Sequence, residues 1–302
     1  MVSPSLSTVA GQRLRWIEGH STLTTVCLTF DFDAVSLWVT TFKATSPTPV
    51  SRGEYGARVG LPRVLDLLAN KKIRATFFVP THSAVSFPEI TRRIAREGHE
   101  IALHGFAHET PVGLSREQEA NLLDRSIAGL RNVLGEDFSP KGYRSPAWDL
   151  SENSVSLLVE RGLIYDSSMM ADDFRPYRAR TGDTVNENEF SAGESTPLIE
   201  IPVAWELDDF PYFTFLNKPL YSGLRNPKDV FLCWKGEFDY CHTYVKNGVF
   251  TLTMHPQIIG RGPRMVMLER LVDHMRQQSN VTFLTVAEAA KQASFEINGT
   301  GL

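Results

Sequence analysis

The sequence contains little cysteine and no long hydrophobic run. Its 302 residues include three cysteines, Cys27, Cys233 and Cys241, too few and too widely spaced for a disulfide framework or a zinc knuckle. No uninterrupted apolar stretch approaches the roughly 20 residues that span a bilayer. The first residues also lack the basic start and apolar core of a secretory signal. These absences predict a cytoplasmic protein with no membrane partner.

An excess of one charge is absent as well. The formal net charge is −4 and the 31 basic residues are scattered, so no basic stripe predicts a nucleic-acid partner. No glycine-rich nucleotide loop follows a predicted strand, which argues against a redox or phosphate-transfer enzyme. The composition, 42% hydrophobic and 22% charged, is typical of an ordinary globular protein.

Apolar runs rich in strand-forming residues alternate with helical patterns along most of the chain. Strands are expected at 25–32, 75–80, 99–105, 141–146, 163–168, 198–205, 248–256 and 281–286. Helices are expected at 61–71, 87–97, 115–134, 150–162, 226–245, 263–278 and 286–294. This alternation predicts a parallel sheet with helices outside it. Seven or eight units fit a distorted (β/α) barrel of the α/β class, and a doubly wound open sheet is the alternative.

The domain organisation follows from the same pattern. We expect one barrel domain over 23–295, an irregular amino-terminal arm over 1–22 and a carboxyl-terminal tail over 296–302. Residues 40–56 read as a polar loop rich in Ser, Thr and Pro. Residues 172–196 show no clear period and are interpreted as a long excursion over the mouth of the barrel.

Acidic and imidazole side chains follow two of the predicted strands. Asp31 and Asp33 follow a buried strand, where carboxylates are costly unless something compensates them. His104 ends the third predicted strand, and His108 comes four residues later beside a glycine. A helical turn would set the two imidazoles on one side, as a metal pair requires. Capping roles for the aspartates and core positions for the histidines are the alternatives.

Two further strands end in groups of the same kind. Arg144 follows the fourth predicted strand, and His255 follows the strand at 248–256. In a (β/α) barrel the active site lies at the carboxyl ends of the strands, so these side chains are expected to meet there. Pairing with a surface acid is the alternative for Arg144.

The expected cluster suits hydrolysis assisted by a metal. Asp33, His104 and His108 make a three-ligand site for a divalent ion, which acidifies its bound water and polarises a carbonyl. Asp31 then suits the general base, with His255 as the general acid. Arg144 suits the group that keeps Asp31 ionised and aimed. Imidazole and carboxylate ligands favour zinc, with cobalt or nickel as alternatives.

Four short motifs carry a family resemblance. "TFDFD", "HGFAHE", "YRSPAW" and "TMHP" occur in the order of the motifs of the polysaccharide deacetylase family, also called the NodB-homology domain or carbohydrate esterase family 4. The resemblance runs from about residue 26 to 290. It implies a distorted (β/α) barrel and metal-dependent removal of acetyl groups. It also implies that the backbone N–H of Ala147 stabilises the developing oxyanion.

The sequence departs from the usual family pattern in its first motif. Phe32 separates Asp31 from Asp33, whereas the two acids are adjacent in most members. Because residues i and i+2 of a strand point to the same side, both acids are still expected to face the site. This split motif resembles a cytoplasmic branch of peptidoglycan deacetylase-like proteins, cyclic imidases and allantoinase-like enzymes. That branch implies a homo-oligomer.

The substrate is left open between two classes. N-acetylated sugars or glycans are one, and small cyclic imides or ureides are the other. Trp148 and Trp205 are candidates for the binding surface, because aromatic faces suit a sugar as well as a flat imide ring. Asp208 and Asp209 are candidates for orienting His255 or binding substrate polar groups, with loop capping as the alternative. A non-catalytic binding protein on a retired enzyme fold is the alternative to a hydrolase.

Overall fold

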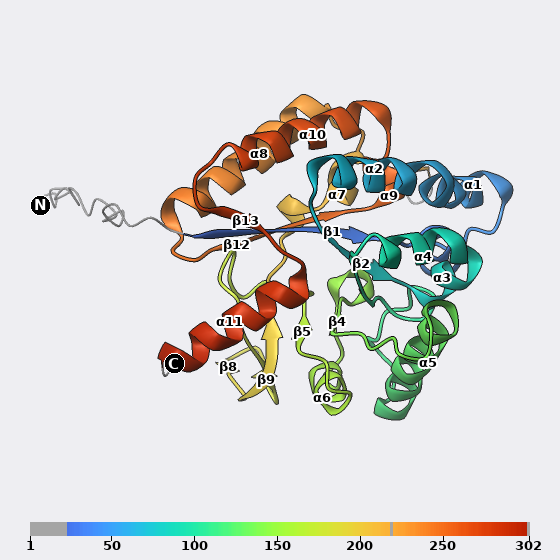
Figure 1. Cartoon of the computed structure of the whole chain (residues 1–302). Helices are drawn as coiled ribbons and strands as arrows, with labels where there is room; N and C mark the ends of the chain where they lie inside the picture. The colour runs from blue at the N-terminus through green and yellow to red at the C-terminus, as the bar shows by residue number, and fades with distance from the viewer. Residues whose placement is uncertain (1–22, 218–219, 301–302) are drawn as a thin grey trace, which may run out of the picture.

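A computed structural model describes residues 23–217 and 220–300 of the chain. The predicted arm over 1–22 lies outside the described residues. The part that is described contains a curled sheet with helices packed around it (Figure 1). No helix in the described ranges is long and apolar enough to cross a membrane.

Nine strands form the main sheet. Their order is β12-β1-β2-β3-β4-β5-β9-β6, with β13 paired to the first half of β1. The strands are β1 (Thr24–Asp31), β2 (Thr76–Val79), β3 (Glu100–Leu103), β4 (Gly142–Tyr143), β5 (Tyr165–Asp166), β6 (Tyr177–Thr181), β9 (Glu194–Glu200), β12 (Val249–Met254) and β13 (Val281–Phe283). All neighbours pair in parallel except β6, which is antiparallel to β9.

The sheet is a partly open barrel, as the sequence predicts in its distorted form. Parallel strands need covered crossovers, and the helices supply them: α2 (Leu61–Lys71), α3 (Thr81–Ser86), α4 (Pro88–Arg96), α5 (Arg116–Leu134), α6 (Ser154–Glu160), α8 (Pro227–Tyr244) and α10 (Gly262–Arg276). Among the described residues, β12 and β6 lie at opposite ends of the strand order and do not pair with each other. The barrel therefore stays open between these two strands.

Local sequence explains several of the helix boundaries. The side chain of Ser115 accepts from the backbone of Gln118, and the side chain of Gln118 accepts from the backbone of Ser115, so a capping box starts α5. Proline occupies the first turn of α4, where its missing N–H costs nothing. Helix α2 ends at Lys72, which takes a left-handed conformation.

Alternate residues of β1 face the two sides of the sheet. Val26, Leu28 and Phe30 join the large core beneath the outer helices. Cys27 joins a smaller core on the other side, which α11 (Val286–Thr300) closes. Because side chains alternate along a strand, Asp31 shares the side of Cys27. The inner face of the curled sheet thus holds α11 at one end and the end of β1 at the other.

The expectation of a polar loop over 40–56 is wrong. Most of that segment is helical, with a π-helical turn at Leu37–Thr41, helix α1 (Pro47–Tyr55) and a second π-helical turn at Gly56–Gly60. Helix α1 begins at a proline, which suits a first turn but reads as loop composition in the sequence. Gly53 allows the close packing, because a Cβ there would lie 2.6 Å from the carbonyl oxygen of Ala34.

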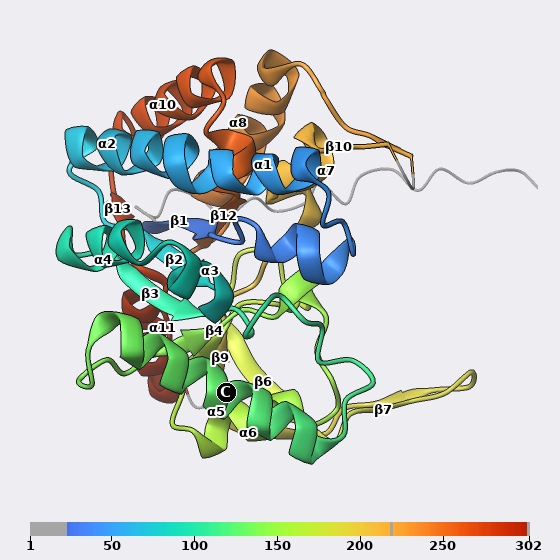
Figure 2. The same cartoon turned by 90° about the vertical axis from the view of Figure 1, so that its right-hand side faces the viewer.

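The segment at 172–196 is also more regular than expected. It forms an antiparallel arm built from β6 and β9, continued by the short hairpin of β7 (Thr184–Val185) and β8 (Phe190–Ser191). In Figure 1 the arrow of β1 points to the right, and Figure 2, seen from that side, shows the hairpin projecting sideways from the body of the molecule. The hairpin therefore does not cover the mouth.

The carboxyl-terminal boundary differs from the expected one. Helix α11 continues to Thr300, across the position where a tail was expected to begin at 296. Alanine residues of this helix pack into the smaller core, and this packing anchors the helix beyond its first turns. The assignment of 23–295 to one domain otherwise stays a prediction.

Candidate active site

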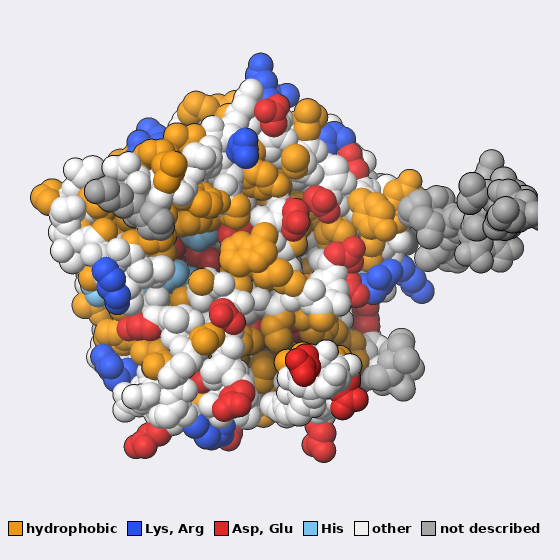
Figure 3. Space-filling view, turned by 180° about the vertical axis from the view of Figure 1, so that it is seen from behind, with side chains coloured by type: hydrophobic (Ala, Val, Ile, Leu, Met, Phe, Trp, Pro, Cys, Tyr) orange, Lys and Arg blue, Asp and Glu red, His pale blue; other side chains and the backbone are white. Residues whose placement is uncertain are grey.

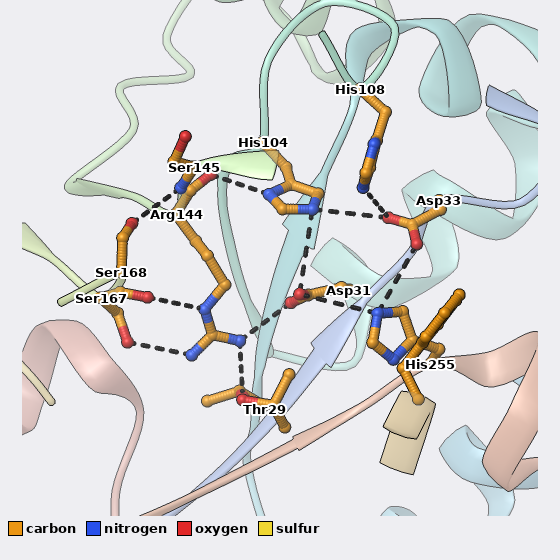
Figure 4. Close-up of polar contacts among 12 residues, drawn as sticks. Thr29, Asp31, Asp33, His104, His108, Arg144, Ser145, Ser167, Ser168 and His255 are labelled. Carbon is orange, nitrogen blue, oxygen red and sulfur yellow. Dashed lines mark hydrogen bonds and ion pairs between the residues drawn. The ribbon is translucent and has the colours of Figure 1, made fainter. Parts of the chain in front are cut away.

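Three potential metal ligands converge at the carboxyl ends of β1 and β3. Asp33 Oδ1 lies 3.5 Å from His104 Nε2 and 3.8 Å from His108 Nε2. All three side chains are buried. Figure 4 shows both imidazoles pointing at the Asp33 carboxylate. The structure thus brings together the three residues that the sequence nominates as ligands.

The histidine pair is held by a turn with positive φ angles and not by the expected helical turn. After β3 the chain turns through Gly105, with φ +71°, and His108 itself has φ +67°. Glu109 accepts from the backbone N–H groups of Phe106 and Ala107 at 3.2 and 2.7 Å, which fixes the turn. A positive φ is uncommon for a residue other than glycine and recurs at functional sites.

Each of the two histidines has a hydrogen-bond partner at Nδ1. Nδ1 of His104 lies 2.7 Å from the backbone oxygen of Arg144, and a carbonyl only accepts, so Nδ1 carries the proton. Nδ1 of His108 lies 2.7 Å from the hydroxyl of Thr41. Burial lowers the pKa of His104 and, more strongly, that of His108. Neutral imidazoles with free Nε2 lone pairs are the form that a metal binds.

The donor set fits a divalent metal ion. Oδ1 of Asp33 is buried and has no hydrogen-bond partner among the described residues. Two ligands about 2.1 Å from a tetrahedral ion lie roughly 3.4 Å apart. The separations of 3.5 and 3.8 Å between Asp33 and the two imidazoles are close to that value. A buried carboxylate oxygen without a donor, facing two imidazole lone pairs, suits a cation.

Asp31 lies beside this group but is bound to a different partner. Its Oδ1 accepts from Arg144 Nη1 at 2.9 Å, and its Oδ2 lies 3.8 Å from His104 Nε2. Arg144 is fully buried and also donates to the hydroxyl of Thr29 and to Ser167. Burial alone would raise the pKa of Asp31, but Arg144, His104 and His255 together outweigh it and hold the pKa below its usual value.

His255 faces the two aspartates from the end of β12. Its Nε2 lies 3.7 Å from Asp33 Oδ2 and 4.0 Å from Asp31 Oδ2. Its Nδ1 bonds to Asp209 Oδ1 at 2.7 Å, and its backbone N–H donates to the same carboxylate. Burial would lower the pKa of His255, but Asp208 and Asp209 outweigh it and hold the pKa well above its ordinary value. Asp208 and Asp209 thus form ion pairs with His255.

A cavity of about 560 Å³ adjoins the site. His108 and Ala147 line it, together with Thr40, Thr41, Lys43, Glu109, Thr110, Pro146 and Asp149. Ala147 and Trp148 both have φ +56°, so the chain turns sharply after Pro146 and exposes Ala147 at the wall. Figure 3 shows histidine and acidic side chains at the bottom of a recess rimmed by hydrophobic groups.

The remaining predicted residues lie next to residues of the site. The Arg144 guanidinium is 5.9 Å from the ring centroid of Trp148, and Asp208 Oδ1 is 3.5 Å from His255 Nδ1. The rings of Trp148 and Trp205 stack with centroids 4.3 Å apart, and Trp205 is 45% exposed. Asp208 is buried, and its Oδ1 accepts from the N–H of Phe210 at 2.9 Å, which caps α7 (Asp209–Phe213). The roles of these three residues toward a substrate stay predictions.

Several contacts of the site were not nominated from the sequence. Gln257 Nε2 donates to Asp33 Oδ2 at 3.3 Å, and the hydroxyls of Ser36 and Ser83 donate to the backbone oxygen of Asp33. Thr41 bonds to His108. Gln257 lies two residues after His255, and that proximity was the one available signal. Serine and threonine have no spacing that would mark them in a single sequence.

Comparisons with known proteins agree with the fold and with the family resemblance. The family model described as "Polysaccharide deacetylase" matches residues 22–165. A "Peptidoglycan deacetylase" of Helicobacter pylori is 34% identical over 273 residues, covering 86% of this chain and 92% of that protein. A "Peptidoglycan deacetylase-like protein" of Gibberella zeae is 29% identical over 290 residues, covering 88% of this chain and 85% of that protein.

Solved structures show the same similarity. The crystal structure of a Mycobacterium smegmatis protein that carries the polysaccharide deacetylase name is 32% identical, with a TM-score of 0.81 and 92% of each chain covered. An allantoinase structure at 20% identity and a TM-score of 0.72, covering 90% of each chain, shares the fold alone. On its identity to the Helicobacter and Mycobacterium proteins, the chain belongs to the polysaccharide deacetylase family.

Proposed function

We propose that this protein is a metal-dependent hydrolase that removes N-acetyl groups from sugar or glycan substrates. One observation carries the proposal: the unpartnered Oδ1 of Asp33 and the Nε2 atoms of His104 and His108 converge beside a separate Asp31. A structural ion site would need the three ligands, but it would not need a second buried carboxylate with its own arginine.

Asp33, His104 and His108 would hold the ion. When bound, a divalent ion at this position would polarise the acetamide carbonyl and acidify a water molecule. Zinc suits two imidazoles and a carboxylate, and cobalt and nickel accept the same ligands. Gln257 donates to the Asp33 carboxylate, and the hydroxyls of Ser36 and Ser83 donate to the backbone oxygen of Asp33. These hydrogen bonds hold Asp33 in place.

Asp31 would act as the general base. Its lowered pKa keeps it ionised at neutral pH, and Arg144 occupies one carboxylate oxygen while Oδ2 stays on the side of the imidazoles. This oxygen would take a proton from water as the water oxygen attacks the carbonyl carbon. Because Arg144 has further bonds to Thr29 and Ser167, the guanidinium holds Asp31 in a fixed direction.

His255 would act as the general acid. Its raised pKa keeps the imidazole protonated at neutral pH, and Nε2 faces the two aspartates. The Nε2 proton would pass to the departing nitrogen as the C–N bond breaks, which leaves acetate and a free amine. The backbone N–H of Ala147, on the cavity wall shared with His108, would donate to the oxyanion.

A pair of stacked aromatic rings supports a sugar as substrate. The exposed ring of Trp205, backed by Trp148, offers an aromatic face on which a pyranose can stack. Asp208 contributes a polar group beside His255. The cytoplasmic location and the homo-oligomeric state stay predictions.

A turnover screen tests the proposal. Purified protein is stripped with a chelator, reloaded with Zn²⁺, Co²⁺ or Ni²⁺, and offered acetylated chito-oligosaccharides beside small imides and ureides. We expect acetate release from the oligosaccharides, its loss on stripping and its return on reloading. Hydrolysis of the imides or ureides alone would assign the protein to the other substrate class. Full acetate release from stripped protein would contradict a metal-dependent mechanism.

A further inference from the structure

One side chain outside the proposed ligand set bonds to His108 twice. The hydroxyl of Thr41 lies 2.7 Å from Nδ1 of His108 and 3.3 Å from the backbone oxygen of the same residue. Thr41 is the last residue of the π-helical turn at Leu37–Thr41, 67 positions away in the chain. π-Helical turns are rare in proteins, and those that occur often lie at functional sites.

The two bonds together determine which atom carries each proton. A hydroxyl has one hydrogen, and a carbonyl oxygen accepts only, so Thr41 donates to the backbone oxygen of His108. For both contacts to be hydrogen bonds, the hydroxyl oxygen accepts from Nδ1 of the ring. Nδ1 is therefore protonated, and the lone pair of Nε2 points toward Asp33 Oδ1, 3.8 Å away.

The same contacts hold a strained backbone. His108 has φ +67°, a strained conformation for a residue other than glycine, which persists only where the surrounding contacts impose it. The Thr41 hydroxyl contacts both the carbonyl oxygen and the ring of His108. Without the hydroxyl, the ring would lose the partner that fixes its tautomer and the backbone would lose one restraint.

The orientation of the His104 ring depends on a backbone group and not on a side-chain hydroxyl. Its Nδ1 donates to the backbone oxygen of Arg144, which every substitution at position 144 retains. Of the two imidazoles, His108 is thus the one whose orientation a single side-chain change can release.

We propose that Thr41 is a positioning residue that preorganises His108 for metal binding by fixing its Nδ1–H tautomer and its left-handed backbone. This inference rests on the proposed function, since it assigns His108 to the metal. Groups that orient a ligand in this way typically change metal affinity by about 10- to 100-fold when they are removed.

The first test measures Zn²⁺ affinity by competition with a chromophoric chelator. Thr41→Val keeps the shape of the side chain and removes the hydroxyl, so we expect the dissociation constant for Zn²⁺ to rise about 10-fold or more. Thr41→Ser keeps the hydroxyl and should stay near the wild-type affinity. Thr40→Val is the matched control, because Thr40 lines the same cavity and its side chain makes no hydrogen bond to His108 in the described part of the chain.

The second test does not depend on metal. Long-range ¹H–¹⁵N spectra of metal-free protein labelled at histidine report the tautomer of each ring, and a His108→Ala sample assigns the signal. We expect the Nδ1–H form in wild type and in Thr41→Ser, and a gain of the Nε2–H form in Thr41→Val. Thermal melting of the metal-free variants checks that each is folded, and Thr41→Ala replaces Thr41→Val if the latter does not fold.

The outcomes separate the two ideas. Wild-type affinity in Thr41→Val, or equal losses in Thr41→Ser and Thr41→Val, would overturn the role of the hydroxyl. An unchanged tautomer in Thr41→Val would do the same without any metal. A wild-type protein that binds no Zn²⁺ but shows the expected tautomer change would contradict the proposed function and leave the contact itself supported.

Discussion

Zinc binding by this protein is expected to weaken steeply as the pH falls, because the Asp33 carboxyl must lose a proton before it can bind a cation. Burial, opposed by His255 and reinforced by the nearby Asp31, raises the pKa of Asp33 to about 8 in the metal-free protein. Burial lowers the pKa of His104 and His108, so these rings are already neutral, and protons compete little with the metal ion for their nitrogen atoms. The pH dependence should therefore come chiefly from one group.

The magnitude follows from the pKa. With a pKa of about 8, roughly 1% of Asp33 is ionised at pH 6 and roughly 9% at pH 7, so the apparent affinity should rise about ninefold between them. An ordinary aspartate, whose pKa is 3.8, would be fully ionised at both values and would give no change. At pH 6 the binding of one ion should release close to one proton from Asp33.

Isothermal titration in buffers of different ionisation enthalpy measures both quantities. Chelator competition keeps the free Zn²⁺ concentration defined at each pH. Asp33→Asn is the control, because its neutral amide has no proton to release, and we expect weaker binding with little dependence on pH. A flat affinity between pH 6 and 7, with no proton released by the wild type, would refute the argument that burial keeps Asp33 protonated.

Three further predictions test the proposed roles. Asp31→Asn should retain Zn²⁺ and lower kcat by about 100-fold or more, the usual scale for a general base, and unchanged turnover would remove Asp31 from that role. Asp209→Asn should lower the pKa of His255, so the alkaline limb of the kcat/KM profile should move to lower pH. A limb that does not move would show that Asp209 does not raise the pKa of the general acid. Trp205→Ala should raise KM for a chito-oligosaccharide roughly tenfold with little change in kcat. The Trp205 ring stacks on the buried ring of Trp148 and is itself exposed, so it can bind a sugar without taking part in the chemical step. An unchanged KM would show that the sugar does not use this ring.

Local patterns were sufficient for most of the helices and strands. The apolar spacing over 61–71 predicted α2 with its bounds, and the helix predicted over 115–134 starts at the capping box of Ser115 and Gln118. Both signals act within a few residues, so a single sequence contains them in full. The prediction of a loop over 40–56 was wrong because helix α1 depends on a contact outside the segment. Gly53 packs closely against the backbone of Ala34, which lies outside the residues whose local pattern was read.

The candidate residues of the site were also visible, but their arrangement was not. Parallel strands bring their carboxyl ends to one edge, so Asp31, Asp33, His104 and Arg144 could be expected near each other. Which aspartate faces the imidazoles and which faces the guanidinium depends on distances of 3.5 and 2.9 Å. The amino-acid order does not encode such distances locally.

The sequence by itself determined the order of strands and helices, the family motifs and the titratable groups that the strand ends deliver. Only the tertiary structure decided that the sheet stays open, that 172–196 forms a projecting arm and that Thr41 bonds to His108. The physical reason is the range of the interactions. Hydrophobic periodicity and capping operate within a turn or two, whereas tautomers, unpartnered oxygens and shifted pKa values arise where segments far apart in the chain are packed into contact.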